Sequence, residues 1–285
     1  MNIQQECIEC LINQAQRVST SINASDELSK ELISSVSEAS KNFSFNQSPP
    51  EIASSLYENM ATIANRSDLY KKQKEDATKL ASKLLPTLKE KLLNSQNLLL
   101  DATKISVAGN VIDLATTVMF DLEDQLEEIF DVDFAYDDFE ELKNSLQTSS
   151  TLLFIGDNVG EHIFDYLYIE KIQELFPKLE ISYMVRGNPI INDVTMKEAK
   201  EIGFDKLCSL VDSGVNTPGF AYDRANKFSK DLFDSADMVI TKGMGNFECL
   251  SEAHRKNLFF LFKVKCNVVA SCVGKSLGDL ICKKI

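Results

Sequence analysis

Asp157, Asn158 and Glu161 follow one another closely after the short apolar run TLLFI at residues 151–155. Carboxylate and amide oxygens are hard ligands of the kind that Mg²⁺ or Mn²⁺ takes while it keeps waters for a substrate phosphate. The cluster therefore suits a divalent cation. The alternative, that Asp157 or Asn158 only caps a helix that begins near Gly160, is equally consistent with this stretch alone.

A second polar loop, Arg186 to Thr195, follows the apolar run EISYMV. Arg186 can hold a phosphate through two parallel hydrogen bonds. Asp193 can offer a second carboxylate to the same cation if its strand lies beside the strand that precedes Asp157. Asp193 or Asn192 could instead cap the next helix.

A third candidate stretch is the run DMVIT with the residues that end it, Lys242, Gly243, Met244 and Gly245. Backbone amides freed by two glycines can cradle an anion, and the lysine adds a positive charge where a phosphoryl oxygen would lie. The spacing does not match a P-loop. It also fails the dinucleotide-binding fingerprint, because Glu248 stands where the third glycine of that fingerprint belongs. A surface lysine before a flexible turn is the alternative.

The elements that must position these residues change character along the chain. Residues 1–104 contain no convincing strand, and their apolar spacing predicts a helical subdomain, as in SPPEIASSLYENMATIA with Ser48 as a cap. Residues 105–285 alternate short apolar runs with helical stretches, which predicts an α/β domain with a mostly parallel sheet between two helix layers. Ligands bind at the carboxyl ends of such strands. Ser213, after the third run, can donate to an anion there or belong only to a turn.

The strand ends together offer two carboxylates and a lysine-glycine anion site, which is the equipment for metal-assisted transfer of a phosphoryl group to water. Two other classes stay open. One is a non-catalytic module that binds phosphate or a nucleotide on the same rim. The other is a methyltransferase, which fits less well because a carboxylate at Asp157 would repel an anionic cofactor.

Composition limits the partners and the compartment. The formal net charge of −13 and the pI near 4.7 argue against nucleic acid or an anionic membrane as the main partner. No apolar stretch reaches the roughly 18 residues that span a bilayer and no signal peptide is evident, so we expect a cytoplasmic protein.

Seven cysteines, an odd number, favour reduced thiols. Cys7 and Cys10 share a helix face without the further ligands of a zinc site, so packing is the simpler interpretation. His162 is expected on a helix surface.

Six stretches resemble the metal-dependent damage-control phosphatases, a family first catalogued as domain of unknown function 89. In chain order they are CIEC at 7, AGNVID at 108, GDNVGEHIFD at 156, RGNPIINDVT at 186, ADMVITKGMGNFE at 236 and KCNVVA at 265. They span nearly the whole chain, and CIEC resembles the subset of the family with a C-x-x-C motif. The resemblance implies a three-layer α/β/α domain joined to a helical N-terminal subdomain.

The resemblance also implies roles for particular residues. Asp157, Asn158 and Asp193 would ligate a divalent cation, which could be Mg²⁺, Mn²⁺, Co²⁺ or Ni²⁺. Lys242 would contact the phosphate of the substrate. The implied substrates are small phosphometabolites such as sugar phosphates, and the sequence specifies no oligomeric state.

Further residues and the attacking group are less defined. Asn110 and Asp113 look like additional pocket residues. We prefer attack by a metal-activated water with Asp193 or Glu161 as the assisting base. Direct attack by Asp157 as a nucleophile stays open.

Overall fold

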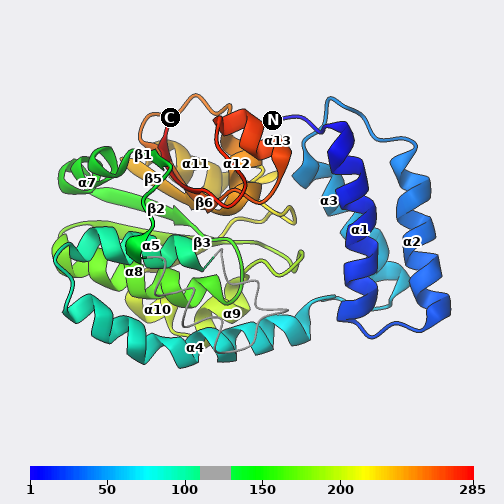
Figure 1. Cartoon of the computed structure of the whole chain (residues 1–285), viewed down its shortest axis with the longest axis horizontal. Helices are drawn as coiled ribbons and strands as arrows, with labels where there is room; N and C mark the ends of the chain where they lie inside the picture. The colour runs from blue at the N-terminus through cyan, green and yellow to red at the C-terminus, as the bar shows by residue number, and fades with distance from the viewer. Residues whose placement is uncertain (110–129) are drawn as a thin grey trace.

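A single seven-stranded sheet forms the centre of the molecule (Figure 1), for which the computed structural model describes residues 1–109 and 130–285. The strand order is β1-β7-β6-β5-β2-β3-β4, and every neighbouring pair is parallel except β6 with β7. This confirms the expected mostly parallel sheet. The strands are β1 (Tyr136–Asp137), β2 (Thr151–Ile155), β3 (Glu180–Val185), β4 (Ser209–Asp212), β5 (Met238–Lys242), β6 (Leu258–Lys263) and β7 (Leu280–Lys284).

Helices precede the sheet and then alternate with its strands. The leading ones are α1 (Gln5–Ser21), α2 (Asp26–Ser40), α3 (Pro49–Ile63), α4 (Lys71–Leu93) and α5 (Leu98–Ala108). The later ones are α7 (Phe139–Thr148), α8 (Glu161–Leu175), α9 (Met196–Glu201), α10 (Phe204–Leu207), the 3₁₀ turn η1 (Tyr222–Arg224), α11 (Lys227–Ser235), α12 (Gly243–Leu250) and α13 (Asn267–Val273).

Alternating side chains along the central strand build two cores, one on each face of the sheet. Leu152 and Phe154 of β2 enter the core covered by α4, α5 and α8, whereas Leu153 and Ile155 enter the core covered by α11, α12 and α13. A strand that buries both faces reads as a continuous apolar run, which explains the sequence TLLFI. Figure 1 shows the sheet between these two helix layers, the three-layer arrangement that the sequence predicts.

The N-terminal helices α1 to α3 have a hydrophobic core of their own and stand at one side of the sheet (Figure 1). Helix α3 begins as its sequence predicts: Ser48 and Glu51 form a capping box, and Pro49 occupies the first turn. Helices α4 and α5 instead bury Leu88 and Ile105 in the core of the sheet. The division of the chain at residue 104 stays a prediction.

One loop ties the two parts together. Ile190, from the loop between β3 and α9, is 4% exposed and belongs to the core of α1 to α3. Its neighbour Ile191 has a φ of 45°, a left-handed conformation that a β-branched residue adopts only under strain. The loop is therefore anchored in the N-terminal helices and held in a specific shape.

The structure bears on the expectations about membrane spans and about reduced cysteines. Within 1–109 and 130–285, no helix is long and apolar enough to cross a membrane. All seven cysteines are free, with Cys7 half-buried and Cys10 exposed.

Candidate active site

The candidate site lies where the direction of the strand order reverses. Strand β2 has β3 on one side and β5 on the other, and all three run parallel. Their carboxyl ends therefore meet at one edge, the position at which doubly wound sheets bind ligands. Asp157 follows β2, Arg186 follows β3 and Lys242 ends β5.

Backbone hydrogen bonds bring the segments after β2 and β3 side by side. The N–H of Val194 donates to the carbonyl of Asp157 over 2.8 Å, and the N–H of Val159 donates to the carbonyl of Asn192 over 2.8 Å. Asn158 and Asp193 form an isolated β-bridge between the two segments. The structure thus places Asp157 and Asp193 on neighbouring segments at the same edge.

A fully buried arginine lies between the two carboxylates. Arg186 Nε donates to Asp193 Oδ2 over 2.8 Å, and Arg186 Nη2 lies 3.5 Å from Asp157 Oδ1. Its Nη1 has no hydrogen-bond partner among the residues that the structure describes. Because burying an unpaired guanidinium donor is costly, Nη1 is a candidate donor to an anionic ligand.

Asn158 bridges two further carboxylate oxygens. Its Nδ2 donates to Asp157 Oδ2 over 2.8 Å and to Glu161 Oε1 over 2.9 Å. Neither Asp157 nor Asn158 caps α8 through its side chain, because the N-cap residue is Gly160 and its cap has no side-chain hydrogen bond. The capping interpretation of this stretch is therefore not what the structure shows.

Helix α9 likewise begins without using the candidate carboxylate. Its N-cap is Thr195, which forms a capping box with Glu198. The side chain of Asp193 is consequently left to face Arg186.

Lys242 is buried in a network that includes Asp165, a residue to which sequence reasoning gave no role. Lys242 Nζ donates to Asp165 Oδ1 over 2.7 Å and to the carbonyl of Ser106 over 2.6 Å, and it lies 3.6 Å from Glu161 Oε2. The hydroxyl groups of Ser106 and Tyr183 also donate to Asp165. The spacing of Glu161 and Asp165, which puts both carboxylates on one face of α8, was the available signal.

Asn246 is a second residue without an earlier assignment. Its Nδ2 donates to the carbonyls of Gly156 over 3.2 Å and Lys242 over 2.6 Å, and its Oδ1 accepts from Arg186 Nη2 over 3.4 Å. It therefore joins the ends of β2 and β5 to the buried arginine. Asn246 follows Lys242 by four residues, so the two residues lie on the same side of the first turn of α12.

The two glycines after β5 are sites of close approach. Gly243 opens α12 with a φ of 78°, and a Cβ there would lie 1.9 Å from Asp157 Oδ2. A Cβ at Gly245 would lie 2.1 Å from the carbonyl oxygen of Pro218. Glycine is needed at both places because no side chain fits. The carboxylate of Asp157 thus lies against the positive end of a helix.

The remaining candidates have different outcomes. Ser213 is buried at the end of β4, where its hydroxyl accepts from the N–H of Val215 over 3.4 Å, within its own loop. Asn110 and Asp113 lie outside the described residues.

The expected surface position of His162 is wrong: it is fully buried, and its Nδ1 accepts from the N–H of Gly160. The reason is that His162 belongs to the first turn of α8, in which Glu161 to Asp165 are all buried.

Burial makes the carboxylates of the site weak acids. Desolvation raises the pKa of Asp157 to about 7, and the charge of Asp193 adds to this while Arg186 opposes it. Desolvation likewise raises the pKa of Glu161 to about 7 and that of Asp193 to about 6. Burial lowers the pKa of Lys242, but Asp165 and Glu161 outweigh it, so its pKa is raised. The charged forms of these carboxylates are therefore disfavoured in the metal-free protein.

These shifts predict how the stability of the metal-free protein depends on pH. A carboxyl with a raised folded-state pKa stabilises the fold below its unfolded value, near 4, and loses that contribution as pH rises through its folded value. We expect the free energy of unfolding to fall by about 2–4 kcal/mol between pH 5 and pH 8 in urea titrations without metal. Asp157→Asn should reduce this fall, and identical pH profiles for the variant and the parent protein would contradict the assignment.

The donor set is suited to a hydrated cation and not to a closed protein cage. Among the described residues, no three or more His, Cys, Asp or Glu side chains form a group that could hold a metal. The site offers two carboxylates, from Asp157 and Asp193, and the amide of Asn158. Mg²⁺ commonly binds through one or two carboxylates plus water and phosphate. Turning over the Asn158 amide would present its oxygen to the ion. The residues therefore fit such an ion.

Comparison with known proteins gives matches along the entire chain. A family model described as the damage-control phosphatase ARMT1-like domain matches residues 3–281. A damage-control phosphatase of Pyrococcus horikoshii is 32% identical and covers 100% of this chain and 98% of its own. A damage-control phosphatase of Archaeoglobus fulgidus is 27% identical, with 100% of both chains covered. The crystal structure of a DUF89 family protein from P. horikoshii matches with a TM-score of 0.93 at 30% identity, over 100% of this chain and 99% of that one.

Proposed function

Because the chain belongs to the damage-control phosphatase family, we propose that it is a metal-dependent phosphatase whose active site is the rim around Asp157, Asp193 and Lys242. The observation that carries this proposal is the meeting of Asp157 and Asp193 at one buried arginine, at the carboxyl ends of two parallel strands. A bound divalent cation would make the charged forms of these buried carboxylates favourable.

Asp157, Asn158 and Asp193 are the residues that would hold the divalent ion. When bound, that ion supplies Lewis acidity and neutralises charge on the phosphoryl oxygens. Arg186 holds Asp193 through a hydrogen bond, and the lack of a side chain at Gly243 lets Asp157 approach the start of α12.

The chain's own groups then have distinct roles. Glu161 is the better candidate for the base that takes a proton from the attacking water, because its pKa of about 7 is closer to neutral pH than the pKa of Asp193, about 6. Arg186 Nη1 is a donor for a phosphoryl oxygen. Lys242 keeps a positive charge beside Glu161 and contacts the phosphate when the substrate is bound.

The substrates are proposed to be small phosphomonoesters such as sugar phosphates. The test is phosphate release from a panel of such esters by chelator-stripped protein, with Mg²⁺, Mn²⁺, Co²⁺ or Ni²⁺ restored singly and a monovalent salt of equal ionic strength as the control. We expect release only with a divalent ion. Release that persists without any divalent ion would exclude the proposed mechanism, and binding without release under every condition would favour a phosphate-binding module.

A further inference from the structure

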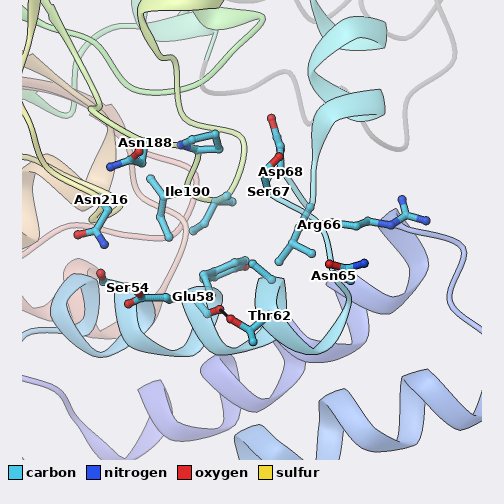
Figure 2. A pocket seen from close by; sticks show the side chains of 15 residues that line it. Ser54, Glu58, Thr62, Asn65, Arg66, Ser67, Asp68, Asn188, Ile190 and Asn216 are labelled. Carbon is cyan, nitrogen blue, oxygen red and sulfur yellow. Dashed lines mark hydrogen bonds between the residues drawn. The ribbon is translucent and has the colours of Figure 1, made fainter.

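A cavity of about 690 Å³ lies between the N-terminal helices and the α/β part, and residues 188–191 of the loop between β3 and α9 line part of it. Figure 2 shows Ser54, Glu58 and Thr62 along the side of α3 that faces the cavity, with Asn188 and Asn216 across from them. Its size is within the range of small-molecule sites in proteins. Nothing in the proposed chemistry uses this space.

The lining has the chemistry of a site for an uncharged hydroxyl-bearing group. Amide and hydroxyl side chains, including those of Asn188, Asn216 and Ser54, can donate to and accept from hydroxyl groups. Ile190 and Ile191 add an apolar surface. The charged residues of the lining are two acids, Glu58 and Asp68, and one base, Arg66, so the cavity does not favour a phosphate.

The cavity and the active site share one loop. Asn188 follows Arg186 by two residues, and Ile191 precedes Asp193 by two, so the cavity wall begins within about 7 Å of each along the backbone. The strained Ile191 separates the buried anchor Ile190 from Asp193. The loop that carries the proposed phosphate contact therefore also forms one wall of the cavity.

We propose that this cavity is the specificity subsite of the enzyme, which receives the hydroxyl-rich, unphosphorylated part of the substrate. This inference rests on the proposed function, because it places the phosphate at the carboxylate rim. Selection among phosphomonoesters then depends on α3 and the 188–191 loop, outside the residues that perform the chemistry. The substrate class is a phosphorylated polyhydroxy compound at least as large as a monosaccharide.

A matched pair of tryptophan variants on α3 tests the subsite. Glu58→Trp places a large side chain at the cavity, whereas Asn59→Trp adds the same side chain at an exposed position one residue along, outside the cavity lining. The measured quantity is the kcat/KM for a hexose phosphate divided by that for methyl phosphate, whose organic part is too small to reach the cavity. We expect Glu58→Trp to lower this ratio about tenfold and Asn59→Trp to keep the parent ratio. Equal ratios for the two variants would overturn the proposal.

A second readout does not depend on turnover. The chain contains no tryptophan, so the introduced indole is its sole indole fluorophore. In Glu58→Trp, the hexose phosphate should shift the indole emission with saturation, whereas inorganic phosphate should not, and Asn59→Trp should respond to neither. A shift without phosphate release by the parent protein would refute the phosphatase and support the subsite. Release by the parent protein, with no shift and an unaltered ratio, would refute only the subsite.

Discussion

Asp157→Asn is expected to lower metal-dependent phosphate release by about a thousandfold while the protein stays folded. The substitution removes one of the two carboxylates that would hold the cation, and it keeps the size of the side chain beside Gly243. Activity at saturating metal and substrate, compared with the parent protein, is the measurement.

The stability of the same variant separates a functional role from a structural one. Because burial raises the pKa of Asp157, its charged form destabilises the metal-free fold at pH 8. Asp157→Asn should therefore unfold at the same or a higher urea concentration than the parent protein. Asp205→Asn, at an exposed position, is the control and should keep both activity and stability. Lost activity together with a clearly lower unfolding midpoint would argue that Asp157 is mainly structural.

Lys242→Met is expected to destabilise the protein by about 3–5 kcal/mol. The substitution leaves the fully buried Asp165 without its cation and removes the bond to the Ser106 carbonyl. Glu161 also loses a positive neighbour at 3.6 Å. Urea unfolding at neutral pH measures the loss.

Combining Lys242→Met with Asp165→Asn should restore most of the stability, because no uncompensated charge then remains at Asp165. If Lys242 also contacts the phosphate, the double variant will fold yet remain inactive. Asp165→Asn alone is the control, since it keeps the lysine. A double variant as active as this control would restrict Lys242 to a structural role.

The strands that are buried on both faces could be predicted because each is a continuous apolar run of the right length. This holds for β2, β5 and β6, whereas the edge strand β4 exposes Ser209 and Asp212. The two missed strands carry weaker signals. β1 has only two residues in an acidic stretch, and β7 ends in two lysines. Both lie at one end of the sheet, where pairing with β6 and β7 decides their structure and local sequence does not.

The acidic residues of the site could be predicted from the sequence, but the partners of its buried charges could not. Strand-end positions indicated Asp157 and Asp193 because parallel strands bring their carboxyl ends together. The partners of buried charges could not be read in the same way: Arg186 faces carboxylates, and Lys242 is bonded to Asp165 and to a carbonyl of α5. Such pairings depend on which helices cover the sheet edge, and this information is spread over distant parts of the chain.

The anchoring of Ile190 among α1 to α3 has a consequence for partial unfolding. If these helices open as one cooperative unit while the sheet remains folded, the loop with Asp193 loses its attachment at the same moment. Activity would then disappear in a state whose sheet still resists amide exchange. The N-terminal helices thus limit the working lifetime of the site under heat or proteolysis, although the residues proposed for the chemistry lie on the other part of the molecule.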